Sequence, residues 1–163
     1  DVLMPPLSPA ELTLGYALGG VTRGLLVAFA VWVALTPFIP LAVHSLFLIV
    51  FYATMAALML ALVGLIAGIW ADKFDHVAAV QNFVITPLSF LSGTFYTLDR
   101  LPESWHIAAF LDPFFYMIDG LRYGFIGTAD GDPWTGAVLV VAVNAVLLAV
   151  AHRMMARGYK LKA

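Results

Sequence analysis

NFVITPLSFLSGTFYTLDRLP, residues 82–102, and LDPFFYMIDGLRYGFIG, residues 111–127, lie close together in the chain but differ in character. The first begins as an apolar helix that Pro87 and Gly93 would bend, because proline lacks a backbone donor and glycine lacks a Cβ atom. The second is rich in aromatic residues and carries charges near its centre. This order predicts a broken membrane helix followed by a short helix of another kind.

Helix-end signals frame the second segment. Asp112 followed by Pro113 is a favourable N-cap and first-turn pair, and Gly127 suits the left-handed position after a helix. A helix of about 15 residues rises roughly 22 Å, less than the ~30 Å hydrocarbon core of a bilayer. Asp119 and Arg122 also lie near its middle. We therefore predict a surface or re-entrant helix here.

The composition is that of a membrane protein. Of the 163 residues, 63% are hydrophobic and 11% are charged, and the mean hydropathy is +0.96, which is more apolar surface than a soluble domain of this size can bury. A net charge of -2 gives no reason to expect nucleic acid as a partner. The absence of cysteine excludes disulfides, thiolate metal sites and a cysteine nucleophile.

Four stretches are long enough to cross a bilayer, which takes about 20 apolar residues in a helix. They are residues 13–36, 41–70, 77–97 and 134–152. The joints between the first three spans are too short to hold a domain. The expected fold is therefore all-α, a polytopic membrane helix bundle with four transmembrane helices and short external helices between the last two.

The cations set the expected orientation, because lysine and arginine are retained on the cytoplasmic side. Residues 153–163 carry four of them, so this tail is expected inside, with the N-terminal segment, and residues 98–133 outside. If the helix that ends near Gly127 crossed the membrane, the loop at residues 71–76 would move outside. The chain opens with Asp1 and lacks a basic signal-peptide region, so we interpret it as the C-terminal part of a longer protein.

Polar residues in the third span recur at helical spacing. Asn82, Thr86, Ser89 and Gly93 fall on one face of an α-helix. This face is either part of a translocation path or an ordinary packing face, since small and hydroxylated residues also let membrane helices approach closely.

Small residues in the first two spans indicate helix packing. They are Gly15, Gly19, Gly20 and Gly24 in the first span, and Ala53, Ala57, Ala61, Gly64 and Gly68 in the second.

Two polar residues also fall within spans. Asn144 is expected to bond between helices. Arg23 needs a partner or must snorkel to the membrane edge, which is possible if the span begins near Tyr16, and otherwise marks a functional site.

Enzyme chemistry has little support. The chain has no phosphate-binding G-x-x-x-x-G-K-[ST] loop, so ATP hydrolysis would have to come from another subunit. Its four histidines are scattered without the spacing of metal ligands, and no paired carboxylates occur within the spans.

Several ordered motifs resemble the ABC-2 permease family, the membrane subunits of type-2 ABC exporters, over essentially the whole chain. The strings that carry the resemblance are PLSFLSGTFY (87–96), Leu101-Pro102, Asp112-Pro113 with Tyr116, and DGLRY (119–123). The segment MPPLSPAEL (4–12) is similar to the cytoplasmic coupling segment of the family.

The resemblance implies the last four spans of a six-span permease in the bacterial inner membrane. It implies a second copy of the permease, most simply in a homodimer, and an ABC ATP-binding subunit that holds ATP and Mg, with no cofactor in this chain. The implied coupling residues are Met4, Pro5, Pro6, Leu7, Ser8, Pro9 and Glu11, within a segment 1–11 that precedes the membrane domain 12–163.

In a transporter, the polar face of the third span and the short helix after it would indicate where cargo passes. The candidate path residues are Asn82, Thr86, Ser89, Phe90 and Gly93, and the candidate external gate or cap consists of Asp112, Pro113, Tyr116, Asp119, Arg122 and Tyr123. The ion pair that Asp119 and Arg122 can form is either a solvated pair on this cap or part of a gate. A drug, lipid or polysaccharide would fit as cargo. An ion-coupled secondary transporter and a structural membrane subunit remain as alternatives.

Overall fold

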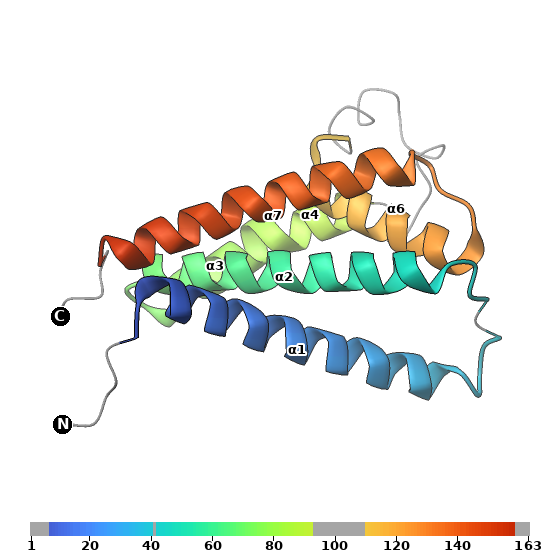
Figure 1. The fold of residues 1–163 in the computed structure, drawn as a ribbon, viewed down its shortest axis with the longest axis horizontal. Helices are drawn as coiled ribbons and strands as arrows, with labels where there is room; N and C mark the ends of the chain where they lie inside the picture. Colours follow the sequence, from blue (N-terminus) through green and yellow to red (C-terminus); the bar gives the residue numbers. More distant parts are fainter. Residues whose placement is uncertain (1–6, 41, 93–109, 159–163) are drawn as a thin grey trace.

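The computed structural model describes residues 7–40, 42–92 and 110–158, which form helices joined by loops and contain no strand. This confirms the all-α prediction for the described part of the chain (Figure 1). The elements are α1 (Pro9–Leu35), α2 (Leu46–Trp70), α3 (Phe74–Val80), the π-helix η1 (Gln81–Ile85), α4 (Thr86–Leu91), α6 (Pro113–Ile126) and α7 (Pro133–Ala156).

Three of these helices, α1, α2 and α7, are long and apolar enough to cross a membrane. The beginning of α1 and the end of α7 lie at the same end of the bundle, whereas α6 lies toward the other end (Figure 1). The expected boundaries shift by a few residues. The largest shift is at α2, which begins at Leu46 instead of residue 41 because the backbone N–H groups of His44 and Ser45 donate to the carbonyl of Gly124.

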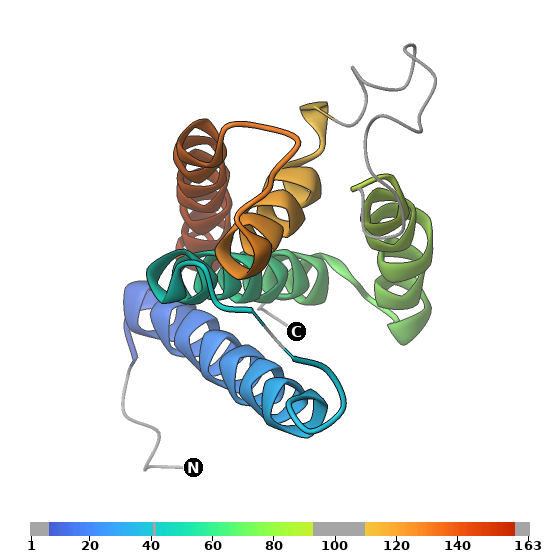
Figure 2. The same cartoon turned by 90° about the vertical axis from the view of Figure 1, so that its right-hand side faces the viewer.

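Helix α2 is the centre of the bundle. It packs against α1, α6 and α7, and the α3–η1–α4 segment lies on the side of α2 away from α1 and α7 (Figure 2). One apolar cluster joins α2, α6 and α7 through Leu48, Met117 and Val140, among others. A second cluster joins α1, α2 and α7 through Ala17, Leu62 and Ala151.

The packing role predicted for the small residues is confirmed between α1 and α2 at Gly20 and Gly24. A Cβ atom at Gly20 would overlap Cβ of Ala61, and one at Gly24 would lie 2.8 Å from Cβ of Ala57. Neither position has room for a side chain, so both glycines are required for the close approach. By contrast, a Cβ atom at any of the other four glycines of the predicted pattern would meet nothing within 4 Å, so no close approach is seen at Gly15, Gly19, Gly64 or Gly68.

The third expected span is an interrupted helix, as predicted, in the part that the structure describes. Residues 77–97 were expected to form a helix broken at Pro87 and Gly93, and residues 74–91 form α3, η1 and α4 in direct succession, with the π-turn just before Pro87. Residues 93–97 lie outside the described part. The π-turn has a physical cause in Pro87, which cannot donate to the carbonyl of Phe83 and whose ring would collide with it. Accordingly, the N–H of Thr86 reaches back five residues to the carbonyl of Gln81.

Candidate functional site

Helix α6 begins and ends as its sequence predicts. The Asp112 side chain accepts a hydrogen bond from the N–H of Phe114 at 2.9 Å, and Pro113 takes the first helical position. At the other end Gly127 adopts a left-handed conformation with φ of 73°, which glycine adopts without strain. The predicted caps are therefore confirmed, and they fix the length of α6.

The α6 helix is locked against α2 by two of its glycines. A Cβ atom at Gly120 would overlap the ring of Tyr52, and one at Gly124 would lie 2.7 Å from the side chain of Ile49. These contacts leave no room for a side chain at either position. The Gly120–Gly124 spacing of four residues is the sequence signal for this interface, but the sequence did not indicate its partners.

Tyr52 connects three helices. Its ring lies against α6 at Gly120, and its hydroxyl donates a hydrogen bond to the carbonyl of Pro133 at the start of α7. The residue is completely buried. Sequence reasoning missed Tyr52, because a tyrosine in an apolar run carries no local sign of a partner 81 residues away.

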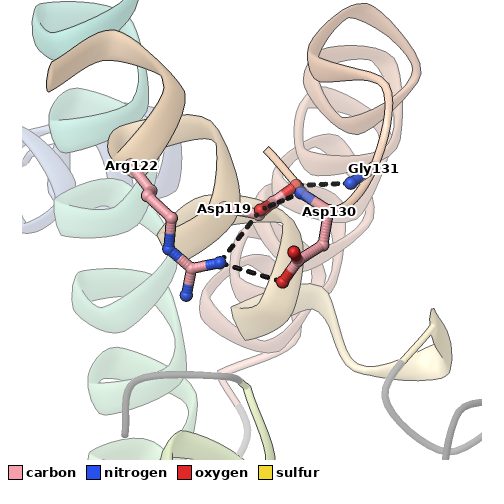
Figure 3. Close-up of polar contacts among 4 residues, drawn as sticks. All are labelled: Asp119, Arg122, Asp130 and Gly131. Atoms are coloured by element: carbon pink, nitrogen blue, oxygen red, sulfur yellow. Dashed lines mark hydrogen bonds and ion pairs between the residues drawn. The ribbon is translucent and has the colours of Figure 1, made fainter. Parts of the chain in front are cut away.

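Asp119 fastens α6 to the loop that leads into α7 (Figure 3). Its two carboxylate oxygens accept hydrogen bonds from the backbone N–H groups of Asp130 and Gly131, each at 2.9 Å. Arg122 reaches Oδ2 of Asp130 at 2.9 Å and Oδ1 of Asp119 at 3.5 Å. The predicted Asp119–Arg122 pair is present, but Asp119 is buried, so it is not a fully solvated pair.

The aromatic residues of the predicted cap also have specific contacts. Tyr116 donates its hydroxyl proton to the carbonyl of Phe110 at 2.9 Å, and the Tyr123 ring packs edge-on against His44 with centroids 5.4 Å apart. Burial of Asp112 raises the pKa of its carboxyl group to about 6, although the N–H of Phe114 acts in the opposite direction. The cap residues are thus gathered around α6 and its junctions with α2 and α7.

The candidate path residues are less closely gathered. Thr86 donates its hydroxyl to the carbonyl of Gln81 at 2.9 Å, and Ser89 donates to the carbonyl of Ile85 at 2.8 Å. The extra residue in the π-turn rotates α4 by about 100° relative to α3, compared with an uninterrupted α-helix. Asn82, within the π-turn, is exposed, whereas Thr86 and Ser89 are half-buried.

Whether these polar residues share one face along a path stays a prediction. Phe90 is exposed in α4. Gly93, the last residue of the predicted face, lies outside the described residues.

The predicted coupling segment is described from Leu7 onward, and Met4, Pro5 and Pro6 lie outside the described part. Ser8 and Glu11 form a reciprocal capping box at the start of α1. The N–H of Glu11 donates to Oγ of Ser8 at 3.3 Å, and the N–H of Ser8 donates to Oε2 of Glu11 at 2.7 Å. This pairing holds an exposed helix start in a defined conformation.

Comparison with known proteins identifies the family. The family described as ABC-2 type transporter matches residues 2–126, which contain every described helix except α7. The chain belongs to the ABC-2 type transporter family. It is also 37% identical over 163 residues to the inner membrane transport permease YadH of Escherichia coli K12, covering 99% of this chain and 63% of that protein.

A second curated protein that this chain resembles is Nodulation protein J of Rhizobium leguminosarum bv. viciae. It is 34% identical over 94 residues, which cover 57% of this chain and 34% of the relative. No solved structure gives a significant match. The chain thus spans less than two thirds of the length of these curated relatives. Family membership and the three apolar helices together establish a multi-pass membrane protein of a transport permease family.

Proposed function

We propose that this chain is the transmembrane part of a permease subunit in an ATP-driven exporter. The observation that carries the proposal is the ABC-2 family match over most of the chain. The similarity to a transport permease, which covers 99% of this chain, supports it. The chain contains no phosphate-binding loop, so an ABC ATP-binding partner would bind ATP and Mg.

The proposed arrangement has four spans in the bacterial inner membrane. The α3–η1–α4 segment and the residues up to 97 would supply the fourth, in addition to α1, α2 and α7. The start of α1 and the end of α7, with the basic tail at residues 153–163, would face the cytoplasm. Helix α6 would then lie on the outer side as a re-entrant or interfacial element, since its 14 residues rise only about 21 Å.

The ATP-binding partner would dock on residues 4–11. The capping box of Ser8 and Glu11 favours this assignment because it makes the start of α1 a rigid attachment point that can transmit a push along the helix. A second copy of the permease would complete the transporter, and membrane lipid would cover the apolar outer surfaces. Residues 12–163 would form the membrane domain.

The movable part of the transporter would be the α3–η1–α4 segment. Its contacts with the bundle, mainly of α3 with α2 and of α4 with α6, are less extensive than those among α2, α6 and α7, although Ile85 and Leu88 pack against the core that these three helices share. Closure of the ATP-binding subunits would shift this segment against that core. Cargo of drug, lipid or polysaccharide type would pass along its polar residues, with α6 as the external gate.

A single-cysteine crosslink tests the coupling. Leu7→Cys places a thiol on an exposed residue next to the capping box, in a chain without native cysteines. In the complete permease, with its candidate ATP-binding subunit, we expect a crosslink whose yield changes when ATP is added. Ile39→Cys, an exposed position beyond the other end of α1, is the matched control and should not crosslink.

Two results would contradict the proposal. One is labelling of the Leu7→Cys thiol only from outside the cell, which would reverse the orientation. The other is equal crosslinking from both ends of α1, which would show that the contact is nonspecific.

A further inference from the structure

The π-turn before Pro87 leaves one backbone carbonyl of η1 without its helical donors. In an α-helix the carbonyl of Asn82 would accept from the N–H of Thr86, but that N–H donates to the carbonyl of Gln81. The donor that a π-helix would use is absent, because residue 87 is proline. The hydroxyl of Thr86 also donates to Gln81, at 2.9 Å. The Asn82 carbonyl oxygen is therefore a free acceptor in both helical patterns.

The side chain of the same residue adds further polar groups at this point. Asn82 is exposed, and within the part of the chain that the structure describes its amide has no hydrogen-bond partner. Asn144 differs, because its amide nitrogen donates to the carbonyls of Met55 at 3.2 Å and Val140 at 3.0 Å. It bonds α7 to α2, as the sequence predicted, whereas Asn82 makes no such bond.

The position of Asn82 makes hydrocarbon a poor environment for its free carbonyl. Asn82 follows Phe74, the first residue of α3, by eight residues, which corresponds to about 12 Å along the axis. In the proposed four-span arrangement this depth is within the bilayer, where irregular backbone is tolerated only if it is buried in protein or lines a water-filled cavity. The residue lies in the α3–η1–α4 segment, the proposed cargo path, on the side of α2 away from α1 (Figure 2).

The charges of this segment favour a ligand that offers a proton. Residues 74–92 contain no lysine or arginine, and Asp75 is their one charged residue. A carbonyl oxygen carries partial negative charge and accepts a hydrogen bond from N–H or O–H groups. Backbone carbonyls freed at breaks in membrane helices coordinate cations in transporters. An oxyanion has no proton to donate and would be repelled.

We propose that the carbonyl and the side-chain amide of Asn82 form a binding site for a hydrogen-bond donor of the cargo, an ammonium or a hydroxyl group. The proposal rests on the proposed transport function and names the class of group that the path selects. The π-turn creates the site, because it directs the N–H of Thr86 away from Asn82.

Thiol labelling tests the site without knowledge of the cargo. Phe83→Cys replaces a side chain that is 80% exposed and next to Asn82, in the complete permease in opened membrane vesicles. Four methanethiosulfonates are compared, with aminoethyl, hydroxyethyl, methyl and anionic ethylsulfonate groups. Their rates are divided by those measured with a free small thiol, so that intrinsic reactivity cancels. The methyl reagent has neither charge nor donor and reports accessibility alone.

The expected result is a preference for the two reagents that donate. The aminoethyl reagent should react roughly tenfold faster than the methyl reagent and the hydroxyethyl reagent roughly threefold faster, since charged donors form the stronger hydrogen bonds. The ethylsulfonate reagent should react no faster than the methyl reagent. A preference for aminoethyl alone would assign an ammonium group to the cargo, and a preference for both would include a hydroxyl group.

A proline substitution removes the proposed site without changing Asn82. Pro87→Ala supplies the missing N–H and lets the α-helical pattern re-form, so the preference should fall to the level of the methyl reagent. Pro133→Ala is the matched control, because the first position of α7 has no use for an N–H within the helix, and it should keep the preference. Asp75→Asn should also keep it, which separates the site from the attraction of that carboxylate.

Three outcomes would overturn the proposal. Failure of all four reagents to label Phe83→Cys, while Leu7→Cys is labelled in the same vesicles, would show that lipid or protein covers the site. Equal rates for donating and methyl reagents would show that no acceptor is available. A preference that persists in Pro87→Ala would exclude the carbonyl as its cause. None of these depends on the crosslink from Leu7→Cys to the ATP-binding subunit, so a failure of this site and a failure of the exporter proposal are distinguishable.

Discussion

Helix α6 and the α3–η1–α4 segment are both short helical pieces next to α2, but they are held in different ways. Side chains and backbone groups of other elements meet α6 at Gly120, Gly124 and Asp119. The hydroxyls of Thr86 and Ser89, in contrast, bond to carbonyls of their own segment. Close packing and hydrogen bonds from other elements therefore set the position of α6. The α3–η1–α4 segment meets the core through apolar contacts of Ile85 and Leu88, and these two hydroxyl bonds shape only the segment itself.

The strongest destabilisation is expected where α6 touches α2. Gly120→Leu would force a side chain into the ring of Tyr52, and we expect it to lower the free energy of unfolding by more than about 3 kcal/mol or to prevent folding. Gly64→Leu is the matched control, since a Cβ atom there meets nothing within 4 Å. Detergent-based thermal unfolding of both variants measures the difference. Equal effects would show that the contact at Gly120 is not specific.

An intermediate effect is expected at the link between α6 and α7. Asp119→Asn replaces one carboxylate oxygen by an amide group, which cannot accept the hydrogen bond from Asp130 or Gly131. The expected loss is about 2 kcal/mol, as for hydrogen bonds to charged groups. Asp130→Asn keeps an oxygen for Arg122. The loss in the free energy of unfolding should stay below about 1 kcal/mol, because the Arg122–Asp130 pair is partly solvated. A smaller loss of stability in Asp119→Asn than in Asp130→Asn would contradict the role of Asp119 as the main link between α6 and the loop before α7.

A change in α4 should have little effect on stability. Ser89→Ala removes a hydroxyl that donates to Ile85 in the preceding turn, and the change in unfolding free energy should stay within about 0.5 kcal/mol. The same variant should alter export if Ser89 lies along the path. Unfolding and export assays on one preparation separate the two effects. A stability loss as large as that of Asp119→Asn would remove the contrast between the two segments.

The sequence predicted those features that local chemistry controls. Asp112, Pro113 and Gly127 mark the ends of α6 because capping depends on residues within one turn. The packing role of Gly20 and Gly24 was also predictable from their spacing, but their partners on α2 were not. The late start of α2 could not be predicted, since it depends on hydrogen bonds to Gly124, far away in sequence.

The interruption at Pro87 was predicted, but its form was not. The proline ring changes the turn that precedes it into a π-helix, which rotates α4 relative to α3. A count at fixed α-helical spacing cannot register such a change. Tyr52 was missed because its importance comes from α6 and α7 meeting on its ring and hydroxyl.

A pair of distance measurements would show whether ATP moves α3–η1–α4 against a fixed α2–α6–α7 core. Spin labels at Phe83 and Ile126, both exposed, report on η1 relative to α6, and labels at Val138 and Ile126 report on α7 relative to α6. In the permease assembled with its ATP-binding subunit, we expect ATP to change the first distance and to leave the second unchanged. A change in the second distance, or no change in the first, would mean that the segment does not move against a fixed core.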